Sequence, residues 1–393
     1  MGKKLARRVA HLKPSPTLQI TAKAKELKAK GVDVIGFGAG EPDFDTPEFI
    51  KEACIRALKE GKTKYAPSAG IPELREAIAR KLYEENRISY KPSEIVVSSG
   101  AKMVLFLIFM ALLDEGDEVL LPSPYWVTYP EQIRFFGGIP VEVPLKKERG
   151  FKLTLDDLKE KVSEKTVALV INSPNNPTGA VYDPKELEKI AEFCLEKNIF
   201  IISDECYEHF TYNAEFVSVA SLSEEVKKIT FTVNAFSKTF SMTGWRVGYV
   251  ACSEEYAKVI ASLNSQSVSN VTTFAQYGAL EALTNPESKE FIKNMRETFR
   301  KRRDIAYKML KEIPEVDVLK PEGAFYIFPD FSQCAKKVGG DVKLSQILLE
   351  KGKVAVVPGS AFGAEGFLRL SYALSEDKLI EGIRRIREVM ETL

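Results

Sequence analysis

The chain has 393 residues, which is more than a single hydrophobic core usually holds, so its length predicts two domains. Its 45% hydrophobic and 28% charged residues are the composition of an ordinary soluble globular protein. The 56 Lys and Arg residues nearly balance the 55 Asp and Glu residues, and the net charge of +1 gives no electrostatic reason to expect binding to nucleic acid or to an anionic membrane.

The N-terminal segment, residues 1–13, is basic but lacks the apolar core of a signal peptide. No apolar run approaches the ~20 residues of a membrane-spanning helix. These features predict a cytoplasmic protein that acts on small molecules.

The side chains that bind metals are sparse. The five cysteines are scattered, odd in number and contain no Cys-x-x-Cys pair, which predicts free thiols. The two histidines, His11 and His209, exclude an all-histidine zinc site. We therefore predict no metal site.

Five apolar, β-branched runs occur in chain order and are followed by helix-like stretches, at residues 94–100, 118–124, 166–177, 199–205 and 228–238. Such continuous apolar strands alternating with helices predict an α/β fold whose mostly parallel sheet is covered on both faces. One of the helices is well marked, because Asp183 can cap it, Pro184 suits its first position and Glu186 follows as an acid.

From residue 283 to 313 the pattern becomes that of one long, charged amphipathic helix with Asn285 as cap and Pro286 at its first position. Shorter strand signals at 323–329, 353–359 and 367–373 precede a terminal helix at 378–391. We expect residues 50–285 to form a large domain. Residues 286–393 are expected to form the interdomain helix and a smaller α+β domain, to which residues 1–49 add an N-terminal arm.

Polar residues follow several predicted strands at their carboxyl ends, where open α/β sheets bind ligands. Asp204, Asn176 and Lys238 end three of these runs, and Gly100 stands at the start of a helix. Taken singly, Asp204 suits a helix or turn cap equally well, and Asn176 suits a turn before a proline. Together they predict one crevice that contains a lysine, an acid and an amide.

This combination suits a cofactor in which a lysine forms an imine with an aldehyde and an acid faces a pyridine nitrogen. Asp204 would keep that nitrogen protonated, while Asn176 and Tyr207 could donate hydrogen bonds to the phenolic oxygen. A phosphate would find its donors in a helix N-terminus, a hydroxyl and a guanidinium; the candidates are the amides of Gly100, Ala101 and Lys102, the Ser237 hydroxyl and Arg246.

The segments "SPNNPTG", "SDECYEHF" and "SKTFSMTGWRVGY" resemble the signature motifs of class I pyridoxal-phosphate-dependent aminotransferases. The resemblance covers essentially the whole chain, including "AGEPDFDTP", "KYAPSAGIPELREAIA" and "VVPGSAFG". It is strongest to bacterial aspartate aminotransferases, whose relatives include dual aspartate and prephenate enzymes. The resemblance implies the fold type I of pyridoxal-phosphate-dependent transferases and pyridoxal 5'-phosphate as the cofactor.

The resemblance also implies roles for single residues. Lys238 would form the imine, Asp204 would pair with the pyridinium, and Trp126 would lie against the cofactor ring and help to bind substrate. Arg369, aided by the Gly40 amide and Asn176, would grip the substrate α-carboxylate. Tyr65 would reach the phosphate of a neighbouring subunit, so a homodimer with shared active sites is expected.

Two departures from the family pattern affect affinity and specificity. Ala235 stands where some relatives carry a phosphate-binding serine, and residues 264–286 contain no Lys or Arg that could bind the distal carboxylate of a partner's substrate. Lys13, with Thr17 nearby, and Lys102 remain as candidates for that carboxylate. We expect ping-pong transamination of aspartate with 2-oxoglutarate to oxaloacetate and glutamate, with prephenate, converted to arogenate, as a further substrate.

Three alternatives remain open from the sequence. An aromatic or alanine aminotransferase would use the same residues, and so would a β-lyase with this cofactor. A cofactor-sensing transcription regulator is disfavoured, because only ~30 residues precede the first strand and the net charge is +1.

Overall fold

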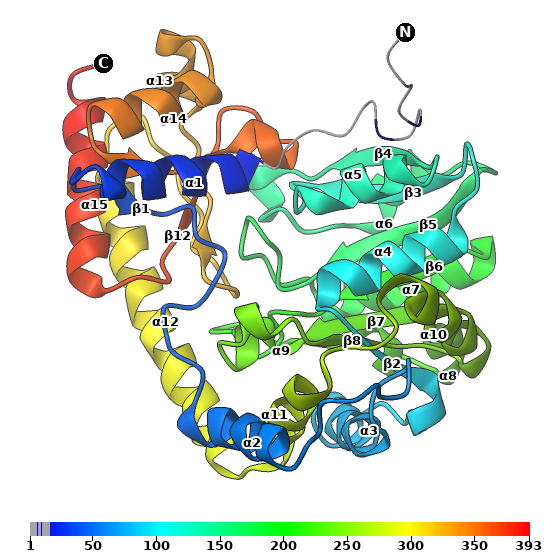
Figure 1. The fold of residues 1–393 in the computed structure, drawn as a ribbon. Helices are drawn as coiled ribbons and strands as arrows, with labels where there is room; N and C mark the ends of the chain where they lie inside the picture. The colour runs from blue at the N-terminus through cyan, green and yellow to red at the C-terminus, as the bar shows by residue number, and fades with distance from the viewer. Residues whose placement is uncertain (1–5, 7–8, 10–15) are drawn as a thin grey trace, which may run out of the picture.

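The computed structural model describes residues 6, 9 and 16–393. Its larger lobe is built around a seven-stranded sheet in the order β2-β8-β7-β6-β5-β3-β4 (Figure 1). Strands β7, β6, β5, β3 and β4 run parallel, and β8 is antiparallel to both of its neighbours. The predicted mostly parallel sheet is confirmed. The strands are β2 Ile95–Ser98, β3 Glu118–Ser123, β4 Ile139–Pro144, β5 Thr166–Asn172, β6 Phe200–Asp204, β7 Thr230–Ala235 and β8 Gly248–Ala251.

Both faces of this sheet are buried, which explains why its central strands read as continuous apolar runs. Alternate residues of one strand enter different cores: Leu169 and Ile171 of β5 pack toward one face, and Ala168 and Val170 toward the other. The first face is covered by α6 Leu155–Lys159, α7 Pro184–Lys197 and α8 Glu224–Ile229, and the second by α4 Ala101–Leu112, α5 Thr128–Phe135 and α10 Glu254–Val268.

The well-marked helix of the sequence is α7. It begins at Pro184, and the Asp183 carboxylate accepts hydrogen bonds from the amides of Lys185 and Glu186, at 3.0 and 3.4 Å. A third set of helices packs beside β2, namely α2 Glu48–Lys59, α3 Pro72–Asn86 and α11 Thr273–Thr284.

The long amphipathic helix is α12, Glu287–Lys311, which runs along the side of the molecule from α11 to the smaller lobe (Figure 1). The helix begins one residue later than predicted, with Pro286 as its N-cap residue. Asn285 still contributes to this end, since its Oδ1 accepts a hydrogen bond from the Glu287 amide at 2.9 Å. The apolar stripe of α12, with Met295, Phe299 and Leu310 fully buried, packs into the core of the smaller lobe.

The smaller lobe contains a three-stranded antiparallel sheet in the order β11-β12-β9, and a parallel pair joins β1 to β10. Because β1 comes from the N-terminal part of the chain, residues far apart in sequence complete this lobe. Its remaining elements are α1 Pro16–Ala29, β1 Ile35–Gly36, β9 Tyr326–Ile327, α13 Ser332–Val338, α14 Asp341–Glu350, β10 Val354–Ala355, β11 Val357–Pro358, β12 Leu368–Ser371 and α15 Glu376–Met390.

Two strands of the large sheet were not predicted. Strand β8 has four residues and begins at Gly248, where an added Cβ would lie 2.6 Å from the Ala101 amide nitrogen. Strand β4 lies at the sheet edge, carries prolines at positions 140 and 144 and exposes residues 139, 142 and 144, so it lacks a continuous apolar run. In the part of the chain that the structure describes, no helix has the length and apolarity needed to cross a membrane.

Candidate active site

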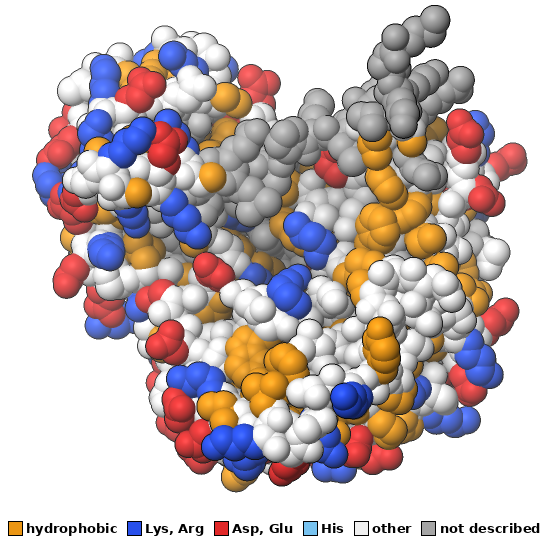
Figure 2. Space-filling model, in the orientation of Figure 1, with side chains coloured by type: hydrophobic (Ala, Val, Ile, Leu, Met, Phe, Trp, Pro, Cys, Tyr) orange, Lys and Arg blue, Asp and Glu red, His pale blue; other side chains and the backbone are white. Residues whose placement is uncertain are grey.

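A cavity of about 460 Å³ lies where the carboxyl ends of β5, β6 and β7 face the smaller lobe. Figure 2 shows this side of the molecule hollowed between the lobes, with Lys and Arg side chains around the hollow. Most of the predicted site residues line the cavity: Gly40, Ala101, Lys102, Trp126, Asn176, Asp204, Tyr207, Ser237, Lys238, Arg246 and Arg369. The fold therefore brings together residues spread over more than 300 positions of sequence.

Lys238 lies in the short helix α9, Phe236–Thr239, directly after β7. Its Nζ donates a hydrogen bond to the carbonyl oxygen of Gly40, on the opposite wall of the cavity. Burial lowers the pKa of its ammonium group to about 8, although Cys206 and Glu41 act in the opposite direction. A larger fraction of this amine is therefore neutral near pH 7 than of an exposed lysine.

Asp204 ends β6 and is 5% exposed. Its Oδ2 accepts a hydrogen bond from the Tyr129 hydroxyl at 2.6 Å, and its Oδ1 accepts one from the Cys206 amide at 3.2 Å. Burial raises the pKa of this carboxyl in spite of these hydrogen bonds. A cationic group bound next to Asp204 would restore its ordinary ionisation.

Asn172 and Asn176 connect β5 to this acid. The Asn172 amide nitrogen Nδ2 donates to the Asp204 carbonyl oxygen at 3.1 Å, and its Oδ1 accepts from the Asn176 backbone amide at 2.9 Å. The strand ends are thus held in register by side chains as well as by the sheet, which pairs Asn172 with Asp204.

The start of α4 lies against the Arg246 guanidinium. Gly100 has a φ of 79°, and a Cβ added to it would lie 2.6 Å from Arg246 Nη2, so glycine is needed for the guanidinium to come this close. In the described residues, no hydrogen-bond acceptor is found for the amides of Ala101 and Lys102. A helix N-terminus with free amides beside a guanidinium is a suitable phosphate site.

Arg369 lies on β12, the central strand of the three-stranded sheet, and is 1% exposed. Its Nη1 donates to Asn176 Oδ1 at 3.0 Å and its Nη2 to the Gly38 carbonyl oxygen at 2.9 Å. Among the residues that the structure describes, no carboxylate pairs with it and its Nε has no acceptor. A buried guanidinium without a carboxylate partner is a suitable site for an anionic ligand.

Trp126 and Lys102 face each other across the same cavity, with Lys102 Nζ 5.0 Å from the centre of a Trp126 ring. Burial, together with the nearby charge of Arg246, lowers the pKa of Lys102. In the described part of the chain Lys102 Nζ has no carboxylate within ion-pair distance, so it is free to bind an acidic ligand.

Four predicted residues are not among those that line the cavity of this chain. Tyr65 is 90% exposed and lies away from it. Thr17 belongs to α1, but its side chain is not described, and Lys13 lies outside the described residues. Gly100 contributes backbone behind the lining residues.

Sequence reasoning missed several residues of this site, among them Tyr129, Asn172, Tyr326 and Lys25. Tyr129 lies three residues after Trp126 and Asn172 directly precedes the motif "SPNNPTG", but no spacing rule links either of them to Asp204. Tyr326 and Lys25 enter the cavity from β9 and α1, so only the folded chain places them there.

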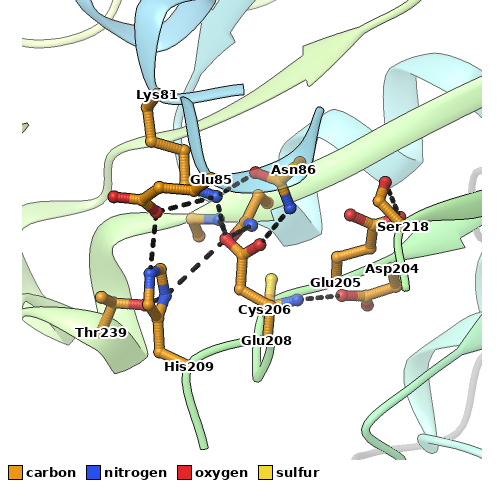
Figure 3. Close-up of polar contacts among 12 residues, drawn as sticks. Lys81, Glu85, Asn86, Asp204, Glu205, Cys206, Glu208, His209, Ser218 and Thr239 are labelled. Carbon is orange, nitrogen blue, oxygen red and sulfur yellow. Dashed lines mark hydrogen bonds and ion pairs between the residues drawn. The ribbon is translucent and has the colours of Figure 1, made fainter. Parts of the chain in front are cut away.

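Behind the cavity lies a second buried polar cluster, in which Lys81, Asn86 and Glu208 point toward one another (Figure 3). The Glu208 carboxylate accepts hydrogen bonds from Lys81 Nζ, from Asn86 Nδ2 at 2.6 Å and from Asn234 Nδ2 at 2.6 Å. Burial would raise the pKa of Glu208, but the Lys81 charge prevails and lowers it to about 2. Every charge of this cluster is already matched.

The residues present fit the predicted cofactor. The glycine-dependent cradle at α4 and Arg246 suits its phosphate, the buried acid Asp204 suits a protonated ring nitrogen, and the amine of Lys238 suits its aldehyde. Each of these groups is polar, lines or backs one cavity and forms no ion pair within 4 Å among the described residues. The cavity thus contains groups that suit the phosphate, the ring nitrogen and the aldehyde of the cofactor.

Comparison with known proteins agrees with this geometry. The family described as aminotransferase class I and II matches residues 32–386. The chain is 79% identical to the probable aspartate/prephenate aminotransferase of Aquifex aeolicus over 100% of both chains, and 51% identical to the aspartate aminotransferase of Bacillus subtilis over 99% of both.

The same likeness holds in three dimensions. A solved structure of the aspartate aminotransferase from Thermus thermophilus with maleate superposes with a TM-score of 0.95 at 47% identity, covering 99% of this chain and 100% of that one. Identity at this level over full length is far above what fold similarity alone requires. The chain therefore belongs to the class I and II aminotransferases.

Proposed function

We propose that this protein transfers the amino group of aspartate to 2-oxoglutarate, giving oxaloacetate and glutamate in a ping-pong reaction. The observation that carries the proposal is one cavity containing Lys238 together with two cations, Arg369 and Lys102, that have no acid partner among the described residues. Two such cations suit a substrate with two carboxylates. Relatives named aspartate aminotransferase, and one solved with the dicarboxylate maleate, support this choice.

Pyridoxal 5'-phosphate is the cofactor of this family, and its aldehyde and electron-withdrawing ring supply a covalent attachment for the amine and a sink for the electrons of the α-carbon. We assign its ring nitrogen to Asp204, its ring face to Trp126 and its phenolic oxygen to Asn176 and Tyr207. The phosphate is assigned to the amides of Gly100, Ala101 and Lys102, the Ser237 hydroxyl and Arg246.

In this proposal Arg369 holds the α-carboxylate, with the Gly40 amide beside it, and so fixes the direction of the bond from the α-carbon to its hydrogen. The Lys238 amine, once free, takes that proton at Nζ and returns it on the other side of the reaction. Its pKa of about 8 makes it basic enough to accept the proton and acidic enough to release it. The buried Asp204 carboxylate stabilises positive charge at the ring throughout.

Lys102 is proposed to bind the distal carboxylate of aspartate, and Lys13 with Thr17 to assist when the substrate is a larger dicarboxylate such as prephenate. An ammonium group on a flexible stem can reach carboxylates at different distances, unlike a rigid guanidinium. This accounts for acidic substrates in a chain whose residues 264–286 contain no Lys or Arg.

The test measures kcat/KM for aspartate, phenylalanine and prephenate in the wild type and in Lys102→Ala, Lys13→Ala and Lys25→Ala. Lys25 is exposed at the rim of the same cavity, so Lys25→Ala controls for the loss of one positive charge. We expect Lys102→Ala to lower kcat/KM for aspartate by about 10- to 100-fold with little change for phenylalanine. A wild type that prefers phenylalanine to aspartate would reject the assignment of aspartate.

A β-lyase with this cofactor is the alternative that the residue set leaves open. The two activities separate cleanly, because a lyase releases ammonia without a keto acid, whereas transamination needs 2-oxoglutarate. Release of ammonia from aspartate or a β-substituted amino acid without keto acid, at a rate comparable to transamination, would favour the lyase.

We further propose a cytoplasmic homodimer in which the exposed Tyr65 reaches the cofactor phosphate of a second copy, with residues 50–285 as the cofactor-binding domain and residues 1–49 and 286–393 as the smaller one. The mass in solution tests the dimer. Tyr65→Phe should weaken cofactor binding at equilibrium by about 5- to 10-fold, because one hydrogen bond to a charged group is lost.

A further inference from the structure

A hydrogen bond between two tyrosine hydroxyls joins the lobes inside the cavity. Tyr207 follows β6 of the larger lobe, Tyr326 begins β9 of the smaller lobe, and their Oη atoms are 2.9 Å apart. Tyr207 is 6% exposed and Tyr326 is 0% exposed, and the two rings meet edge to face at 5.7 Å. Nothing in the sequence indicated a function for Tyr326.

The direction of this hydrogen bond follows from the number of protons. A phenol has one O–H to donate, and the role proposed above for Tyr207 uses that proton for the phenolic oxygen of the cofactor. The Tyr207 oxygen must then accept from Tyr326. In the described residues Tyr207 is the one hydrogen-bond partner found for the Tyr326 hydroxyl, so no competing acceptor is present there.

We propose that Tyr326 is a positioning residue: its hydroxyl donates to Tyr207 and thereby orients and strengthens the hydrogen bond from Tyr207 to the cofactor phenolic oxygen. The inference rests on the proposed function of Tyr207. A hydroxyl that accepts a hydrogen bond becomes a better donor, by an estimated 10–30% per bond. Tyr326 and Tyr207 together therefore stabilise negative charge on the phenolic oxygen of the cofactor more than Tyr207 does alone.

The surroundings of Tyr326 hold its hydroxyl in place. A Cβ added to Gly40 would lie 3.1 Å from the Tyr326 hydroxyl oxygen, so the loop at Gly40 closes off one side. The Arg369 guanidinium carbon lies 4.5 Å from the centre of the Tyr326 ring. One side chain thus contacts both the proposed carboxylate-binding group, through its ring, and the proposed cofactor-binding group, through its hydroxyl.

The geometry separates the two contacts experimentally. Tyr326→Phe removes the hydroxyl and retains a ring under Arg369, which also keeps Phe362 at 5.1 Å and its hydrogen bonds to Asn176 and Gly38. We therefore expect KM for aspartate to stay within about twofold while kcat falls by about two- to fivefold.

The decisive measurement is the pH midpoint of the visible absorbance of the bound cofactor, which reports the proton on the nitrogen that joins Lys238 to it. Weaker hydrogen bonding to the phenolic oxygen increases the affinity of that nitrogen for its proton, so the midpoint rises. We expect Tyr207→Phe to raise it by about one pH unit. Tyr326→Phe should raise it by about a tenth to a third as much.

The experiment uses the holoenzyme as wild type, Tyr326→Phe, Tyr207→Phe and the double variant. Tyr372→Phe is the matched control, because Tyr372 is a buried tyrosine of the smaller lobe whose hydroxyl lies 3.4 Å from the Tyr212 hydroxyl, away from the cavity. If Tyr326 acts through Tyr207, the double variant has the midpoint of Tyr207→Phe and Tyr372→Phe has that of the wild type.

Other outcomes overturn the inference. A midpoint unchanged by Tyr326→Phe but raised by Tyr207→Phe refutes the role of Tyr326 and leaves the proposed function standing. Shifts that add in the double variant show that Tyr326 acts independently of Tyr207. A midpoint unchanged by Tyr207→Phe refutes the role proposed for Tyr207, and the inference fails with it. A rise in KM without a change in midpoint assigns the Tyr326 hydroxyl to the substrate instead.

Discussion

Two buried charged clusters lie side by side in this protein, and they differ in whether their charges are matched. The Glu208 carboxylate accepts hydrogen bonds from the Lys81 ammonium group and the Asn86 side-chain amide (Figure 3), and from the side-chain amide of Asn234. In the cavity, Asp204 and Arg369 are also buried, but among the described residues neither forms an ion pair within 4 Å. Matched charges hold a fold together, whereas unmatched charges of both signs in one cavity are what a charged ligand needs.

Among substitutions in the cavity, removal of the Lys238 amine, to which the cofactor would be attached, should have the largest effect. We expect Lys238→Ala to retain cofactor in the cavity, because the phosphate cradle and Asp204 remain, and to lose at least ~10⁴-fold in kcat, because the nucleophile and the proton carrier are both gone. Steady-state kinetics and the cofactor absorbance measure the two properties.

The control is Lys289→Ala, an exposed lysine of α12, which should leave kcat unchanged. Substantial turnover by Lys238→Ala would show that another amine carries the reaction.

Substitutions of Asp204 test whether a buried acid without an ion-pair partner is needed for binding the cofactor and for turnover, and not for the stability of the fold. Asp204→Ala should bind cofactor weakly, and the isosteric Asp204→Asn should lower kcat by about 10³-fold, since the ring nitrogen loses its counter-charge. The unfolding free energy of cofactor-free Asp204→Asn should change by less than about 1 kcal/mol, because the burial of an unpaired carboxylate is relieved. Denaturant unfolding and steady-state kinetics provide the comparison, and near-normal turnover would mean that another acid faces the ring.

Glu208 should show the opposite pattern. Glu208→Gln leaves the buried Lys81 with only the part-exposed Glu85 carboxylate, 3.7 Å away, as counter-ion. It should therefore lower the unfolding free energy by about 2 kcal/mol. The kcat of the folded protein should remain within about threefold of the wild type, since Glu208 does not line the cofactor cavity. A variant that keeps its stability but loses activity would contradict the distinction between the clusters.

The smallest expected effect is the pH dependence of the rate at which Lys238 captures the cofactor. With the Lys238 pKa lowered by burial to about 8, the rate at which cofactor-free protein captures pyridoxal phosphate should rise with pH through a midpoint near 8, because only the neutral amine attacks. Stopped-flow absorbance measures it.

The lowered pKa of Lys238 also determines how the unfolding free energy changes with pH. Between about pH 8 and pH 10.5 the unfolded chain binds more protons at Lys238 than the folded one, so the unfolding free energy of cofactor-free protein rises with pH in this window. A capture midpoint near the ordinary lysine pKa of about 10.4 would show that the amine is not desolvated.

The sequence alone determined the parts of this protein that depend on local pattern. Continuous apolar runs predicted β2, β3, β5, β6 and β7, and capping residues marked the start of α7 and of α12. Because the ends of parallel strands meet at one edge, Asp204, Asn176 and Lys238 could be placed together before any coordinates existed. Strands β4 and β8 could not, since one is an exposed edge and the other has four residues.

Tertiary structure decided which groups are matched and which are not. The resemblance implied a carboxylate-binding role for Arg369, but only the packing of β12 between β9 and β11 buries it without a carboxylate partner among the described residues. The hydrogen bonds from Tyr129 to Asp204 and between Tyr326 and Tyr207 join residues 75 and 119 positions apart. Burial and hydrogen-bond geometry depend on segments far apart in the chain, so no local pattern encodes them, and these are the properties that make the cavity reactive.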